Sequence, residues 1–184
     1  DGMHLGHQSV IEIARKTRDK SSVGVVTFKP HPRQYFQNDQ PIFRLMRSET
    51  RKRFLKSFGV DALFELPFDC SLATLSPRDF IETILLEKLN VRNIVVGPDF
   101  RFGKNREGSV DFLKSYQKKK KLGLHIAIPY MIEGKVVSSS ELRKKIADGS
   151  VIEVTKMLSR YYEIDGIVEK GFQRGRKLGF PTIN

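Results

Sequence analysis

The sequence predicts an α/β protein in which helices wrap a parallel sheet. Short β-branched runs alternate with helical patterns from residue 7 to about residue 130, and this alternation is typical of that class. The pattern changes after Arg160, where a short apolar run precedes a basic loop that is rich in glycine. We therefore expect two parts, with a boundary near residues 158–160.

The first half of the chain contains two predicted helices and two predicted strands. Residues 7–19 carry an apolar stripe at helical spacing and basic residues at the far end, as the helix dipole prefers. Residues 23–28 are β-branched and predict a strand. A helix over 48–58, with Ser48 as its N-cap, and a strand over 62–66 follow.

The second half repeats this pattern. Ser76-Pro77 predicts a helix start, because Ser is a good N-cap and Pro suits the first helical position. Apolar residues continue at helical spacing to Leu89. The other expected elements are strands over 93–97, 124–128 and 162–168 and helices over 109–121, 138–147 and 150–158.

A loop with two histidines begins the chain, ahead of the first predicted helix. Ligand crevices in open α/β sheets lie beyond the carboxyl ends of strands, so this loop is expected to follow a strand. We therefore expect the first strand of the sheet to be missing from the sequence. The last residues, which follow a glycine-rich loop, are likewise expected to be the start of a truncated part.

Composition narrows the class of function. No segment approaches the ~20 apolar residues of a membrane span. Cys70 is the single cysteine, which fits a reducing, cytoplasmic setting. Residues 101–121 hold eight basic and two acidic side chains, half of the net charge of +12. Such a stretch attracts nucleotides, phosphate esters or nucleic acid, although the Lys118–Lys121 run also fits a solvated helix face.

The loop Asp1–Gln8 is the first candidate site. Gly2 and Gly6 permit close backbone approach, and a helix N-terminus attracts anions. His4 and His7 can donate hydrogen bonds to phosphoryl oxygens, where charge builds during phosphoryl transfer. A pair of ordinary loop or core histidines is one alternative, and a metal pair is another.

The second candidate site is the segment Ser138–Arg143, which begins with three serines. Three hydroxyls at a helix start can cap the helix or bind phosphate. Arg143 lies one turn further on, on the same face as Ser139 and Ser140, and can hold a triphosphate bidentately. Ordinary capping beside a surface arginine explains the same pattern.

Two further segments follow predicted strands. In Thr27–Arg33 two prolines stiffen the loop and hold His31 near the carboxyl edge of the sheet; a rigid turn with an exposed histidine is the alternative. In Val96–Gly103 two phenylalanines flank Arg101 and can bind a planar ring, while Asp99 can orient a substrate group or a metal. Plain packing of the loop is the alternative there.

Together these segments resemble the bacterial bifunctional riboflavin kinase/FAD synthetase family. Five family motifs occur in this chain in the family's order. The histidine loop matches Asp1–His7, Thr-Phe-x-Pro-His-Pro matches Thr27–Pro32, and Leu-Ser-Pro-x-x-Phe matches Leu75–Phe80. Val-Gly-x-Asp-Phe-Arg-Phe-Gly matches Val96–Gly103, and the helix start Ser-Ser-Thr-x-x-Arg matches Ser138–Arg143. Ser140 replaces the threonine of the last segment and keeps its hydroxyl. The end of the chain resembles the opening of the kinase module, with Ile183 departing from Gly-Phe-Pro-Thr-Ala-Asn.

The resemblance implies a fold and an activity for each part. Residues 1–158 are expected to form an FMN adenylyltransferase with a Rossmann-like nucleotidyltransferase sheet, and residues 159–184 to open a β-barrel riboflavin kinase module. The expected reaction joins FMN and ATP into FAD and pyrophosphate with Mg²⁺, and the complete protein is expected also to phosphorylate riboflavin. The expected partners are these small molecules, and neither nucleic acid nor a membrane.

The resemblance also implies roles for particular residues. The expected catalytic residues are His4, His7 and Arg143. The expected ATP-binding residues are Asp1, Gly2, His4, Gly6, His7, Ser139, Ser140 and Arg143. The expected flavin-binding residues are Phe28, Pro30, His31, Asp99, Phe100 and Arg101. Thr182 and Asn184 of the kinase-like end are expected to bind magnesium and ATP phosphates.

Two other functions fit part of the pattern. Another adenylyl- or cytidylyltransferase of the same superfamily would share the Ser138–Arg143 segment and act on a different phosphate monoester, although the kinase-like end argues against it. A nucleic-acid-binding protein would suit a pI near 9.9. The basic stretch, however, has neither a clear base-stacking pattern nor a zinc motif.

Overall fold

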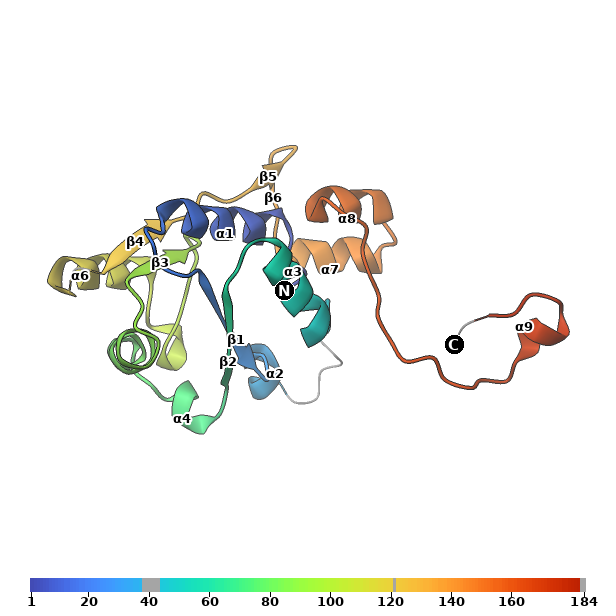
Figure 1. The fold of residues 1–184 in the computed structure, drawn as a ribbon, viewed down its shortest axis with the longest axis horizontal. Coiled ribbons are helices and arrows are strands. Elements are labelled where there is room, and N and C mark those ends of the chain that lie inside the picture. Colours follow the sequence, from blue (N-terminus) through green and yellow to red (C-terminus); the bar gives the residue numbers. More distant parts are fainter. Residues whose placement is uncertain (38–43, 121, 183–184) are drawn as a thin grey trace.

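Two parallel strand pairs form the framework of the fold (Figure 1). The computed structural model describes residues 1–37, 44–120 and 122–182. Strand β1 (Gly24–Lys29) pairs with β2 (Ala62–Pro67), and β3 (Asn93–Val96) pairs with β4 (Gly123–Ile126). Both pairs are parallel, as the alternating pattern predicts, but within the described residues they do not join into one sheet.

Helices follow or precede each of these strands. They are α1 (Leu5–Thr17), α2 (Pro32–Phe36), α3 (Ser48–Ser57), α4 (Cys70–Ala73), α5 (Pro77–Asp79), η1 (Phe80–Lys88), η2 (Lys104–Arg106), α6 (Val110–Lys120), α7 (Ser139–Ala147), α8 (Val151–Leu158) and α9 (Arg174–Lys177). The helices expected over 138–147 and 150–158 are confirmed as α7 and α8, and Ser138 is the N-cap of α7. A short hairpin, β5 (Met131–Ile132) with β6 (Lys135–Val136), was not predicted.

Helix α1 ties the two strand pairs together. Its buried Ile11 belongs to a cluster with Val23 and Leu55, against which Val25 of β1 and Leu63 of β2 pack. The same helix also lies against β3, so one amphipathic helix contacts both pairs (Figure 1). The histidine loop at its N-terminus is thereby held on a packed element.

Two further apolar clusters support the rest of the fold. The larger one buries one face of the helical segment from Phe80 to Leu85 against α6 and β3, with Leu113 and Val96 at its centre. The other joins α7 to α8 through Leu142, Val154 and Leu158, each nearly inaccessible to solvent. This second cluster fixes the start of α7, where the serine segment lies.

The predicted N-cap of one helix is wrong, and a second helix has a detail that the sequence did not predict. Ser48 is the first residue of α3 and not its N-cap, because its hydroxyl donates to the carboxylate of Glu65 instead. The helix that begins at Ser76 does so as expected, with the serine oxygen accepting from the N–H of Asp79 at 3.1 Å. It then widens into a π-helix, in which the N–H of Leu89 donates to the carbonyl oxygen of Ile84, five residues earlier.

The strand expected over 162–168 is also wrong. These residues have no regular secondary structure, all but the half-buried Tyr162 are exposed, and among the described residues no strand pairs with them. A strand needs a neighbour to satisfy its backbone N–H and C=O groups, so an apolar run without one stays irregular. The described residues form no barrel; residues 166–182 run away from the rest of the chain and carry only the single turn α9 (Figure 1).

Among the described helices, none is long and apolar enough to cross a bilayer.

Candidate functional site

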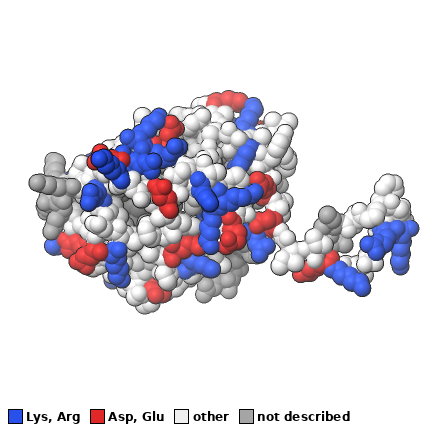
Figure 2. Space-filling view, viewed as in Figure 1, with Lys and Arg blue, Asp and Glu red and all other residues white. Residues whose placement is uncertain are grey.

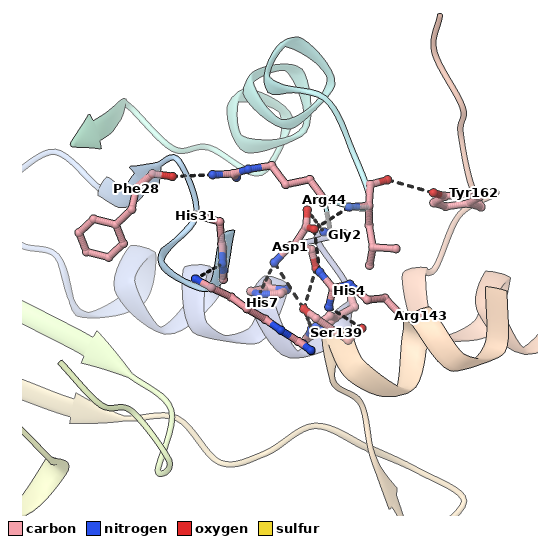
Figure 3. Close-up of polar contacts among 12 residues, drawn as sticks. Asp1, Gly2, His4, His7, Phe28, His31, Arg44, Ser139, Arg143 and Tyr162 are labelled. Carbon is pink, nitrogen blue, oxygen red and sulfur yellow. Dashed lines mark hydrogen bonds and ion pairs between the residues drawn. The ribbon is translucent and has the colours of Figure 1, made fainter. Parts of the chain in front are cut away.

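The N-termini of α1 and α7 meet beside the carboxyl end of β1 (Figure 3). His4 precedes α1, and its carbonyl oxygen accepts from the N–H groups of His7 at 2.8 Å and Gln8 at 3.1 Å. Ser138 caps α7 by accepting from the N–H of Glu141 at 3.2 Å. Two segments about 135 residues apart in the chain thus present their helix N-termini to one place, which favours an anionic ligand.

The two histidines of the loop stack on each other. Their ring centroids are 3.8 Å apart, and His4 is only 6% exposed. A Cβ on Gly6 would lie 3.1 Å from the His4 ring and from the carbonyl oxygen of Val137, so a side chain there would force one of them to shift. The Nδ1 atoms of His4 and His7 are both buried and have no hydrogen-bond partner among the described residues. A ligand group could satisfy these nitrogens.

Ser139 joins the two segments. Its Oγ lies 3.3 Å from Nε2 of His4 and donates to the carbonyl oxygen of Asp1 at 2.9 Å. Since a hydroxyl has a single hydrogen, the contact with His4 then requires the imidazole Nε2–H to donate. The Nδ1 of His4 is therefore the bare, accepting nitrogen of a neutral ring. Ser140, the next residue, lies exposed in the first turn of α7.

Arg143 is held by the carboxylate of Asp1. Its Nη2 donates to Asp1 Oδ2 at 2.9 Å, and its Nη1 donates to the Ser139 carbonyl oxygen at 3.1 Å. The N–H of Leu45 donates to the same Oδ2 at 2.6 Å, and the N–H of Gly2 donates to Oδ1 at 3.0 Å. The guanidinium group therefore has a defined position over the start of α7 (Figure 3).

The three histidines of the site are neutral at pH 7. Burial and, to a smaller extent, the Arg143 guanidinium lower the pKa of His4 to about 4. Burial holds the pKa of His7 well below its usual value. Burial and the Arg44 guanidinium lower the pKa of His31 to about 4. An anion bound here would oppose these shifts and raise each pKa.

The sequence patterns assigned no role to several arginines that lie near the site. Arg44 donates to the carbonyl oxygen of Phe28, at the end of β1, and its positive charge disfavours protonation of His31. Burial and the positive charge of Arg33 lower the pKa of Arg143. Arg51 is 5% exposed and pairs with Glu65, while its Nε and Nη1 have no partner in the described chain. The sequence feature that could have pointed to Arg44 and Arg51 is the group of basic residues over 44–53, and such a group is not specific for any one kind of site.

The rest of the surface mixes both signs of charge. On the face shown in Figure 2, basic and acidic side chains are interspersed. Within the basic stretch 101–121, Lys114 pairs with Asp111 at 3.0 Å. The expectation for the Lys118–Lys121 run concerns side chains that lie outside the described residues.

The residues expected to bind flavin fall into two groups. His31 caps α2 directly after β1, its Nδ1 accepting from the N–H of Arg33 at 3.1 Å, and it lies beside the histidine loop (Figure 3). Phe28 and Pro30 precede it, and the Phe28 ring packs against Phe68 with centroids 5.6 Å apart.

The second group follows β3. Asp99 and Arg101 are exposed, and Phe100 is half-buried against the ring of Phe102, with centroids 5.4 Å apart. Phe102 itself is part of the large apolar cluster and lies against Gly108. This second group is therefore at least partly a packed loop, and no hydrogen bond or ion pair joins it to the histidine loop in the described chain.

The expected metal ligands of the kinase-like end are only partly visible. Thr182 is exposed near Gly175, while Asn184 lies outside the described residues. The described residues contain no group of three or more His, Cys, Asp or Glu side chains placed to hold a metal ion.

Comparison with known families agrees with this geometry. The FAD synthetase family matches residues 1–141, and the riboflavin kinase family matches residues 158–184. The chain is 35% identical to the bifunctional riboflavin kinase/FMN adenylyltransferase of Escherichia coli K12, 34% identical to that of Buchnera aphidicola from Schizaphis graminum and 33% identical to that of Bacillus subtilis 168. Each match covers the whole of this chain and 59%, 60% and 58% of the relative.

A solved structure shares the fold. It is the crystal structure of a Streptococcus pneumoniae protein whose title names it a macrolide-efflux protein, with 31% identity and a TM-score of 0.85. The match covers 100% of this chain and 60% of that one. The chain thus spans about three fifths of the length of its relatives, and it belongs to the FAD synthetase family.

Proposed function

We propose that residues 1–158 carry the adenylyl-transfer centre of an FMN adenylyltransferase. The observation that carries this proposal is the meeting of His4 and His7 with Ser139 and Arg143 at two helix N-termini. A phosphate oxygen of FMN attacks the α-phosphorus of ATP, the bond between that phosphorus and the bridging oxygen to the β-phosphate breaks, and pyrophosphate leaves. No enzyme nucleophile is required, so catalysis comes from positioning and charge stabilisation.

The ATP phosphates fit the histidine side of this site. The buried Nδ1 atoms of His4 and His7 have no partner in the described chain, and a bound phosphate would favour the protonated ring, whose Nδ1–H can donate to a phosphoryl oxygen. Gly2 and Gly6 allow the phosphates to approach the loop backbone, and Asp1 orients Arg143 toward them. Ser139 and Ser140 at the start of α7 would hold the β- and γ-phosphates with Arg143, as a guanidinium binds phosphate bidentately.

Mg²⁺ enters this proposal as a companion of ATP. The ion usually keeps several waters and binds through one or two carboxylates plus substrate phosphates, so it does not require an all-protein cage. Asp1 is a carboxylate in the same loop as the histidines, and both of its oxygens already accept hydrogen bonds. The proposed substrate is therefore MgATP.

We assign the flavin to the side of β1 and β3. In open α/β sheets the ligand crevice lies beyond the carboxyl ends of strands, and His31 follows β1 while Asp99 follows β3. We assign Phe28, Pro30 and His31, with Asp99, Phe100 and Arg101, to this subsite. Residues 159–184 would open a riboflavin kinase module, in which Thr182 and Asn184 bind magnesium and ATP phosphates, and the cytoplasm suits the lone, exposed Cys70.

The decisive test supplies the full-length protein with FMN, ATP and Mg²⁺ and follows the products. We expect FAD and pyrophosphate in equal amounts, with label from α-phosphate-labelled ATP found in FAD. A folded preparation that binds ATP but forms no FAD would refute the proposal. Transfer from CTP, or to a different phosphate monoester in preference to FMN, would support the related nucleotidyltransferase function instead.

A further inference from the structure

The segment that leaves α8 folds back onto the candidate site. Tyr162 packs against the apolar cluster that joins α7 to α8, and its hydroxyl donates to the carbonyl oxygen of Leu45 at 3.0 Å. Arg160 donates to the carbonyl oxygen of Gly2 at 2.9 Å. Glu163 pairs with Arg53, and Asp165 accepts from Thr50 at 2.9 Å. The chain departs toward the exposed end only after these contacts (Figure 1).

Tyr162 reaches the Asp1 carboxylate through one residue. The Leu45 carbonyl oxygen accepts from Tyr162, while the Leu45 N–H donates to Asp1 Oδ2 at 2.6 Å (Figure 3). Arg143 donates to that same oxygen at 2.9 Å. The position of Leu45 therefore links the tyrosine hydroxyl to the carboxylate that orients Arg143.

Arg160 reaches the same carboxylate by a second route. Its guanidinium lies 4.0 Å from the centroid of the Phe54 ring, a cation–π distance, and one of its N–H groups donates to the Gly2 carbonyl oxygen. The N–H of Gly2 donates to Asp1 Oδ1 at 3.0 Å. Gly2 has a φ of +82°, and a Cβ there would lie 2.7 Å from the Leu142 side chain, so this position favours glycine.

Both routes end on Asp1, whose side chain is 5% exposed. The segment is thus linked to both oxygens of one carboxylate, to Oδ2 through Leu45 and to Oδ1 through Gly2. We propose that Arg160 and Tyr162 are positioning residues for ATP binding, which act through Gly2 and Leu45 on the Asp1–Arg143 pair. The inference rests on the proposed adenylyl transfer, and it makes the first residues of the kinase-like part a support of the transfer site.

The segment supplies its own controls. Asp165 contacts Thr50 on α3 and reaches neither Gly2 nor Leu45. If the segment acted only as a general clamp on α3, loss of the Asp165 contact would matter as much as loss of the tyrosine hydroxyl. If it acts through Asp1, the two losses differ.

The test measures ATP affinity by calorimetry and the KM values for ATP and FMN in the full-length protein. Tyr162→Phe should weaken ATP binding about fivefold, the size of one neutral hydrogen bond. The KM for FMN should change less than about twofold, and Asp165→Ala, which removes the acceptor for Thr50, should leave both constants near wild type. In an Asp1→Asn background, Tyr162→Phe should add less than about twofold, because coupled residues are not additive.

Three outcomes would overturn the inference: unchanged ATP affinity in Tyr162→Phe, an equal loss in Asp165→Ala, or full additivity with Asp1→Asn. Arg160→Met removes the donor to the Gly2 carbonyl oxygen and keeps an unbranched side chain over Phe54, so it should also weaken ATP binding. It decides the matter if Tyr162→Phe does not fold, and an unchanged ATP affinity there would overturn the inference. If the wild-type protein makes FAD, the proposed function stands even when one of these outcomes refutes the positioning role. Failure of the inference and failure of the proposed function are therefore distinguishable.

Discussion

The histidine loop and the kinase-like end carry motifs of similar specificity but have very different structures. The loop is buried between α1 and α7, with His4 contacting Ser139 across the chain. In the end segment Phe172, Leu178 and Phe180 are all more than three-quarters exposed. The difference lies in packing partners: Leu142 and its neighbours enclose the loop, while the described residues offer the end segment no sheet or core. A motif therefore identifies chemistry, whereas order at that motif depends on residues elsewhere in the fold.

The sharpest test of the loop is removal of one imidazole. His7→Ala in the full-length protein should lower kcat for FAD formation about 100-fold, the usual cost of losing one donor to transition-state charge. The KM for FMN should change little. His125→Gln, a histidine change on β4, is the matched control and should leave kcat near wild type. A pure loss of FMN affinity would argue against the phosphate role.

Arg143 tests whether the second helix N-terminus belongs to the same site. Arg143→Lys keeps the charge but loses the fork that Asp1 and the Ser139 carbonyl oxygen fix, so the KM for ATP should rise at least about tenfold. Lys144→Ala, one residue further along α7, is the control for a general charge effect. Equal changes in the two variants would separate α7 from the site.

Limited proteolysis compares the two regions directly. Trypsin should cut this chain first at the exposed residues Lys170, Arg174 or Lys177, roughly tenfold faster than at sites within residues 1–158, because cleavage follows local opening. Mass spectrometry of the early fragments identifies the bonds. First cleavage within α1 or α7 would mean that the loop is no better ordered than the end segment.

The smallest expected effect concerns pH. The pKa of His4 is about 4 in the folded chain against 6.5 for a free histidine. Between these values the unfolded state binds more protons, so stability falls as the pH drops from 6.5 to 4. The Tm should fall by roughly 2–4 °C for each kcal/mol lost, measured by calorimetry at steps of pH.

His4→Gln supplies the control for that measurement, since it removes one of the titrating groups. The slope of Tm against pH should become shallower in this variant. A Tm that stays constant, or rises, between pH 6.5 and 4 would contradict burial of the neutral imidazoles.

Most of the secondary structure follows from local chemistry, as two helix starts illustrate. Ser76 and Ser138 cap their helices with the oxygen–N–H bonds that their sequences predict. Ser48 does not, because Glu65 on strand β2 offers its hydroxyl a charged acceptor. Residues 162–168 have strand composition but no strand, since pairing depends on a neighbour that composition does not report.

The sequence by itself determined the α/β alternation, the histidine and serine segments and the family to which they belong. Hydrophobic period and capping act over one or two turns, so they are legible in a short window. Only the tertiary structure decided that Ser139 meets His4, that Asp1 holds Arg143, and that Arg160 and Tyr162 return to support them. Those contacts join residues more than a hundred positions apart, and close packing of α1, α7 and α8, which no local pattern encodes, brings them together.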